Sequence, residues 1–159
     1  MIENLPLKEQ FLREGFVSAL RTIAPAAQPL FGKMNPQQMA EHMAEYIRLG
    51  YGNPVVAEIF YTQDSLEKLR QFILSEKPFK DNTPNPILGN TPRPCVFSDY
   101  AAAVTDVERA VDELFRAFEQ NRELTVASPF FGRLDYPMTV HLLDKHARHH
   151  LRQFGISAA

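Results

Sequence analysis

The sequence predicts an all-α protein built as an antiparallel four-helix bundle. Apolar side chains recur at spacings of three and four residues along several long segments, which is the pattern of one buried helix face. The alternation of apolar and polar residues that is typical of a strand does not persist along the sequence. Five of the twelve prolines fall within residues 76–97, so this stretch is expected to be a long Pro-rich crossover between the second and third main helices.

Length and composition limit the possible classes of protein. The 159 residues, with 45% apolar and 23% charged side chains, are expected to form a single domain, residues 1–159. The net charge of -2 gives no field that would attract nucleic acid or an anionic membrane. A single cysteine excludes an internal disulfide, and no apolar run reaches the ~20 residues of a membrane span. We therefore expect a cytoplasmic protein.

A first helix is predicted over residues 7–23, where Phe11, Phe16, Leu20 and Ile23 lie at mostly helical spacings with charged residues between them.

A second helix is predicted from Pro36 to about Leu49. Asn35 is a good N-cap, proline is favoured at the first helical position, and Gly50 is a typical end. Prolines and a glycine within residues 24–34 indicate that the chain turns between these two helices.

Two further helices are predicted in the middle of the chain. A short one covers about residues 65–75, and the clearest periodicity runs from a cap at Ser98 or Asp99 to about residue 121. Between them, residues 76–97 are expected to be a crossover that covers one face of the core, a lid over a site, or disordered.

Residues 122–131 are expected to form a loop before a last helix, which Asp135 caps and Gly155 ends. Residues 29–35, PLFGKMN, match residues 129–135, PFFGRLD, in chemical character at every position. We interpret the match as a shared entry device in which an apolar pair anchors the loop, glycine allows the turn and Asn or Asp caps the helix. The repeat favours a pseudo-symmetric pair of helical hairpins.

Histidines supply the candidate site. Four of the five lie in the last helix, and the fifth, His42, lies in the second. At 100° per residue, His146 and His150 are i,i+4 neighbours on the rim of the apolar stripe, whereas His141 and His149 face away. His42 holds the equivalent position on its own helix.

Two imidazoles on one helix and a third on a facing helix are a usual way to build a metal site in a helical bundle. We therefore predict that His42, His146 and His150 bind a divalent metal ion, with Zn²⁺ or Ni²⁺ expected, and leave coordination positions open for water or substrate. Spacing alone also allows a polar rim of hydrogen-bonded histidines, or a merely basic helix C-terminus.

The same residues resemble a known family. Residues 146–154, HARHHLRQF, resemble the closing motif of the DinB-like superfamily of bacterial four-helix-bundle metalloenzymes, in which a glutamine, here Gln153, lies three residues after HxxxH. Residues 32–42, GKMNPQQMAEH, resemble its second-helix motif. The longer pattern FFG…H…HH-LRQFG at the end of the chain is similar to one branch of unknown function. The resemblance covers the order of elements over essentially the whole chain.

This resemblance implies that His42, His146 and His150 are the metal ligands of a bundle with a long crossover between its second and third main helices. It also implies a homodimer. Characterised members are transferases or isomerases that use low-molecular-weight thiols, such as mycothiol or bacillithiol, with a zinc-like divalent ion. The resemblance assigns no residue to a substrate.

Other side chains have weaker claims to a role. Cys95 has no CxxC partner, which favours a packed or partly exposed thiol over a nucleophile. Glu45 or Asp144 could orient a ligand histidine, although each is more often a surface charge. Tyr46 and Tyr136 could donate at the mouth of a pocket, with core packing the expected role.

Met39 and Met43 are expected to fill the core. Lys145, Arg148 and Arg152 crowd the end of the last helix, where they would complement its dipole or favour anionic ligands.

Two functions of different classes stay open. One is a divalent-metal-dependent enzyme, a hydrolase or a thiol-dependent transferase, that acts on a small-molecule substrate such as a low-molecular-weight thiol. The other is a non-catalytic helical binding or dimerisation module whose histidines are structural.

Overall fold

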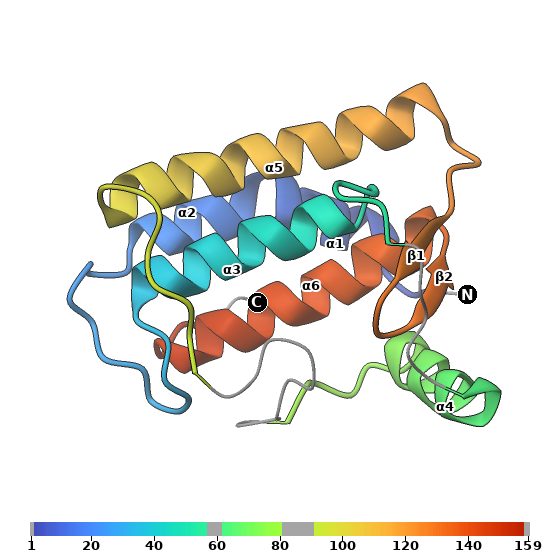
Figure 1. Ribbon diagram of the computed structural model, residues 1–159, viewed down its shortest axis with the longest axis horizontal. Helices are drawn as coiled ribbons and strands as arrows, with labels where there is room; N and C mark the ends of the chain where they lie inside the picture. The colour runs from blue at the N-terminus through green and yellow to red at the C-terminus, as the bar shows by residue number, and fades with distance from the viewer. Residues whose placement is uncertain (1, 57–61, 81–90, 158–159) are drawn as a thin grey trace.

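The computed structural model describes residues 2–56, 62–80 and 91–157, and these are mostly helical, as predicted (Figure 1). The helical elements are α1 (Leu5–Gln10), a π-helical turn η1 (Phe11–Gly15), α2 (Phe16–Arg21), α3 (Pro36–Leu49), α4 (Gln63–Leu74), α5 (Tyr100–Gln120) and α6 (Tyr136–Gln153). A short antiparallel hairpin, β1 (Val126–Ser128) and β2 (Gly132–Leu134), connects α5 to α6. Within the described ranges, none of the helices combines the length and the apolar character that crossing a membrane requires.

The N-terminal helix contains a π-helical turn that the sequence pattern did not predict. The backbone N–H of Phe16 donates to the carbonyl of Phe11, five residues earlier. Both rings are buried. A spacing of five residues would carry one ring off the buried face of a regular α-helix, and the wider turn of η1 brings both inside.

The hairpin shows that the prediction of a plain loop over residues 122–131 was wrong. Val126 pairs with Leu134 and Ser128 pairs with Gly132. Each strand has three residues. A strand of this length is too short for apolar alternation to be visible in the sequence.

The predicted helix starts are confirmed by side-chain caps. Asn35, Asp99 and Asp135 each accept a hydrogen bond from the backbone N–H three residues further on. Asn35 also forms a capping box with Gln38, whose side chain accepts from the Asn35 N–H at 3.0 Å. Gly155 follows α6 with φ +77°, as expected of a helix-terminal glycine.

Four helical segments contact one another in a ring. The α1–η1–α2 segment packs against α5 and α6, and α3 lies between α5 and α6, while α4 contacts α6 from outside the ring (Figure 1). Fully buried apolar side chains from all four segments fill the centre, among them Phe16, Leu20, Met39, Met43, Leu114, Phe118, Val140 and Leu151.

The helices of the ring do not all alternate in direction, so the prediction of a wholly antiparallel arrangement was wrong. The start of α3 lies beside the start of α5, because Gln37 donates to the carbonyl of Phe97 (Figure 1). Arg48, near the end of α3, pairs with Asp106, which lies further along α5. The two helices therefore run in the same direction. A long connection makes this possible because it returns the chain to the end at which α3 began.

The described parts of residues 76–97 lie along the two helices that carry the candidate ligands. Arg152 of α6 donates to the carbonyl of Phe79. On α3, Gln38 donates to the carbonyl of Arg93. The alternatives of a covering crossover, a lid or disorder were stated for the whole of residues 76–97, and residues 81–90 of that stretch lie outside the described residues.

Candidate metal centre

The three predicted ligands meet between α3 and α6. His146 Nε2 lies 2.9 Å from His150 Nε2 and 3.2 Å from His42 Nε2, and one ligand atom from each residue lies within 4.8 Å of the others. Two zinc–nitrogen bonds of about 2.0–2.1 Å at a tetrahedral angle separate their nitrogens by about 3.3–3.4 Å. The three histidines are therefore close enough to hold one metal ion.

The entry loops that position these helices have matching backbones. Gly32 and Gly132 adopt φ values of +75° and +76°, a conformation that side chains with a Cβ rarely adopt. Three residues later, Asn35 and Asp135 cap α3 and α6. The predicted roles of glycine and cap are confirmed. The predicted apolar anchor is wrong for Leu30, which is 72% exposed.

Hydrogen bonds alone do not satisfy this cluster. His150 Nδ1 donates to Gln153 Oε1 at 2.7 Å, so in the neutral ring Nε2 carries the lone pair. His146 Nε2 faces two neighbours, and its single proton can complete one strong hydrogen bond. The contact of His146 with either His42 or His150 is then left without a hydrogen bond. A cation placed among the three lone pairs satisfies them together, which is the chemical reason that the donor set fits a metal ion.

The cluster is held in the neutral form that binds metal. Burial, with smaller contributions from Arg93 and His149, lowers the pKa of His42 to about 4. Burial is also the main cause that lowers the pKa of His146 and of His150 well below its usual value, and repulsion between the rings adds to it. All three imidazoles therefore keep their lone pairs near neutral pH.

Gln153 orients His150 through the hydrogen bond from His150 Nδ1. The sequence had offered Glu45 and Asp144 for this role only as the less favoured alternative to surface charges. These two, Glu45 and Asp144, pair with Arg93 at 2.8 Å and with Arg148 at 3.0 Å. Position 153 belongs to the closing motif, and its spacing of three residues from His150 was the available signal.

Aromatic rings line the centre. Tyr46 lies with its ring centroid 4.6 Å from that of His42 and 4.7 Å from that of His146, and it stacks on Phe130. Phe79 contacts His146 from the segment after α4, at 5.7 Å between centroids. Tyr46 is thus part of the site. Phe79 and Phe130 reach it from segments distant in the sequence, and helical periodicity does not predict such contacts.

Tyr136 lies elsewhere, with its hydroxyl donating to Glu9 at 2.6 Å and its ring packed against Phe115 and Phe118. Core packing, the expected role, is the observed one.

The two remaining histidines stay outside the triad, as the helical phase predicted. His149 packs its ring between those of Phe31 and Phe79. His141 is 1% exposed, and its Nε2 donates to the carbonyl of Ser75 at 3.1 Å. Its Nδ1 has no hydrogen-bond partner among the described residues. His141 thus faces away from the triad but not toward solvent, because α4 and the segment after it cover this face of α6.

The basic residues of α6 have separate partners. Lys145 binds carbonyl groups of Phe72, Ser75 and Lys77 rather than the end of its own helix. Arg148 lies over the ring of Phe11, 4.0 Å from its centroid.

Cys95 is exposed, and its pKa is raised, chiefly by desolvation and by the carboxylate of Glu41. A raised pKa lowers the thiolate fraction, which argues against a nucleophilic role. Met39 and Met43 are both fully buried, as expected of core side chains.

Comparison with protein-family models, with curated proteins and with solved structures finds no match for this chain.

Proposed function

We propose that this protein is a divalent-metal-dependent enzyme whose ion is held by His42, His146 and His150. The observation that carries the proposal is the convergence of three Nε2 atoms from two helices on one point. Zn²⁺ and Ni²⁺ suit a set of imidazole ligands. The reaction is hydrolysis or thiol-dependent transfer on a small molecule.

The ion, when bound by three imidazoles, supplies a Lewis acid that can lower the pKa of a water or thiol or polarise a carbonyl. The residues of the chain prepare the site for it. Gln153 fixes the ring of His150 so that Nε2 faces the centre. The rings of Tyr46 and Phe79 pack against His146, and Phe130 stacks on Tyr46, so aromatic side chains surround the ligands.

We also propose that the chain is a DinB-like four-helix bundle with a long Pro-rich crossover, and that it forms a homodimer as members of that superfamily frequently do. Several observations support the family assignment. The ring of four helical segments, the equal direction of α3 and α5, and a connection of about fifty residues between them suit a bundle with a crossover. The contact of Gln153 with His150 gives a physical role to the glutamine of the closing motif.

Metal analysis of protein purified without an affinity tag tests the proposal. We expect about one equivalent of zinc or nickel per chain, either as purified or after addition of the ion. His146→Ala should abolish this binding. His149→Gln should keep it, because His149 lies on the same helix outside the triad. Absence of metal in the unmutated protein, with no gain on adding zinc or nickel, would overturn the proposal and favour a helical module with structural histidines.

Activity is the second part of the test. Turnover of ester and amide substrates, and of electrophiles offered with low-molecular-weight thiols, should require the metal and disappear in His146→Ala. If the protein binds one metal ion but turns over none of these substrates, the proposed metal site is supported and the proposed enzymatic activity is contradicted.

A further inference from the structure

Residues 75–79, which we call the strap, lie across α6 directly after α4. Phe79, at the end of the strap, places its ring centroid 5.7 Å from that of His146 and 5.9 Å from that of His149. The strap thus contributes one of the rings that line the candidate metal centre.

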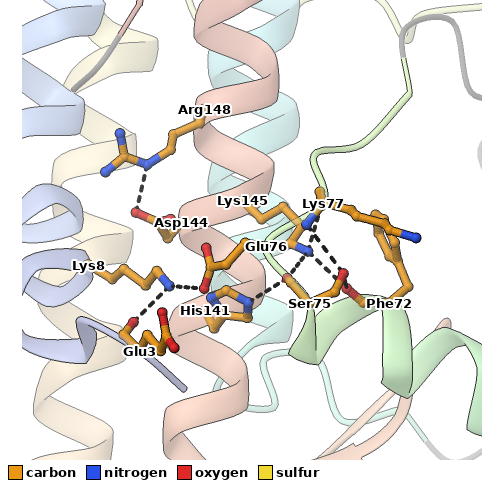
Figure 2. A network of polar contacts seen from close by, with 10 residues as sticks. All are labelled: Glu3, Lys8, Phe72, Ser75, Glu76, Lys77, His141, Asp144, Lys145 and Arg148. Atoms are coloured by element: carbon orange, nitrogen blue, oxygen red, sulfur yellow. Dashed lines mark hydrogen bonds and ion pairs between the residues drawn. The ribbon is translucent and has the colours of Figure 1, made fainter. Parts of the chain in front are cut away.

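A single ammonium group ties the strap to α6. Lys145 Nζ donates to the carbonyl oxygens of Phe72 at 2.9 Å, Ser75 at 2.7 Å and Lys77 at 2.7 Å (Figure 2). Lys145 is 6% exposed. A lysine has three N–H donors, so these bonds use all of them, and the acceptors span the last turn of α4 and the middle of the strap.

Weaker ties flank this one. His141 Nε2 donates to the same Ser75 carbonyl at 3.1 Å, and Lys8 of α1 pairs with Glu76 at 2.9 Å (Figure 2). Arg152 donates to the carbonyl of Phe79 at 3.4 Å. Three of the four tying side chains come from α6, the helix that also carries two of the proposed metal ligands.

Apolar packing of the strap is limited to its last residue, Phe79, whose ring contacts those of Phe72, His146 and His149. Glu76, Lys77 and Pro78 are exposed, and Phe79 is half-buried. Glu76 and Pro78 also border a groove of about 660 Å³ between the N-terminal helices and α6, so the strap is not backed by closely packed atoms there. A segment with few buried apolar contacts opens easily unless polar contacts hold it.

We propose that Lys145 is a positioning residue that latches the strap over the metal centre and so controls how fast ions and substrates enter and leave. This inference rests on the proposed metal-binding function. The carbonyl of Ser75 also accepts from His141, and that of Phe72 also accepts from the Ser75 hydroxyl, so the Lys77 carbonyl depends most on the cation. Without the ammonium group the middle of the strap loses its tie to α6 and opens more often. Phe79 moves with the strap and uncovers His146.

A tryptophan probe tests the latch without any metal. The chain has no tryptophan, so Phe79→Trp places a single indole on the strap. In this background we expect Lys145→Met to raise the acrylamide quenching constant of the metal-free protein at least about threefold, because the strap opens locally. Lys68→Met, the same substitution on the exposed face of α4, should leave it unchanged. Equal quenching in the Lys145 and Lys68 variants, with both folded by circular dichroism, would overturn the latch.

Glu76→Ala keeps the test decisive if Lys145→Met does not fold. Glu76 is exposed, so its substitution is expected to leave the fold intact while it removes the tie to Lys8. A quenching constant at least about twofold above that of the Phe79→Trp parent supports a strap held by polar ties. An unchanged constant overturns it.

Metal exchange separates this inference from the function on which it rests. Zinc transfer from the loaded protein to a coloured chelator should be about tenfold faster in Lys145→Met than in the parent and in Lys68→Met. If the parent binds no zinc, the proposed function fails while the quenching result stands by itself. If the parent binds zinc and the variant releases it at the parental rate, the latch fails and the proposed function survives.

Discussion

Gln153 lies one turn beyond His150 on α6, and its Oε1 accepts a hydrogen bond from His150 Nδ1 across 2.7 Å. The bond places the ring proton on Nδ1 and the lone pair on Nε2, which lies 2.9 Å from His146 Nε2. One amide thus selects the tautomer that a metal ion requires and fixes the plane of the ring.

Gln153→Ala is therefore expected to weaken zinc binding by about 10–100-fold, because His150 loses the partner that orients it. Competition between the protein and a chelator of known affinity measures the change. Gln153→Glu keeps an acceptor at the same place and should retain most of the affinity. Gln71→Ala is the matched control, since Gln71 is exposed on α4 and bonds to Glu67. Parental affinity in Gln153→Ala would contradict this role.

The two entry glycines differ in what surrounds them. Both adopt a positive φ, but a Cβ built on Gly32 would lie 2.7 Å from Gln153 Nε2. At Gly132 the nearest atom, on Leu66, would be 3.5 Å away. The loop before α3 thus reaches the side chain that orients His150, whereas the loop before α6 does not.

Alanine at either glycine is expected to lower the free energy of unfolding by about 1–2 kcal/mol, because a Cβ is strained at positive φ. Gly32→Ala should in addition weaken zinc binding by about tenfold, since it displaces Gln153. Denaturant unfolding in the presence of a chelator gives the first quantity and zinc competition gives the second. Equal zinc affinities in the two variants would show that the contact of Gly32 with Gln153 does not matter to the site.

Local rules account for the part of the site that the sequence predicted. The phase of an α-helix places His146 and His150 side by side whatever the helix packs against. The caps at Asn35 and Asp135 fix where α3 and α6 begin, and hence which residues face inward. His42 could be assigned to the same site because its loop and its phase repeat those of α6.

The features that were not predicted depend on contacts between distant segments. The equal direction of α3 and α5 follows from the path of a long connection, on which helical periodicity carries no information. His141 lies on the polar side of α6 by phase, yet α4 and the strap bury it. In the sequence, Lys145 is one of several basic residues near the end of α6. Its role depends on carbonyl groups from α4 and the strap, whose positions the sequence does not reveal.

The metal-free site carries a pH dependence of stability. The pKa of His42 is about 4 in the folded protein, compared with about 6.5 in an unfolded chain, so between these values the unfolded chain binds more protons. Stability from this group is complete above pH 6.5 and is lost as the pH falls toward 4. At pH 5 the loss from His42 is about 2 kcal/mol, and His146 and His150 add to it in the same direction.

Denaturant unfolding in the presence of a chelator, at pH 7 and at pH 5, measures this loss. The unmutated protein should lose about 2 kcal/mol more between the two pH values than His42→Gln, which cannot protonate at this position. Carboxylates that titrate in the same range contribute to both proteins, so the difference between them isolates the imidazole. Saturating zinc should steepen the loss in the unmutated protein, because protons then also displace the ion. Equal losses in the two metal-free proteins would mean that His42 is solvated, with an ordinary pKa, and that α3 does not bury its ring against α6.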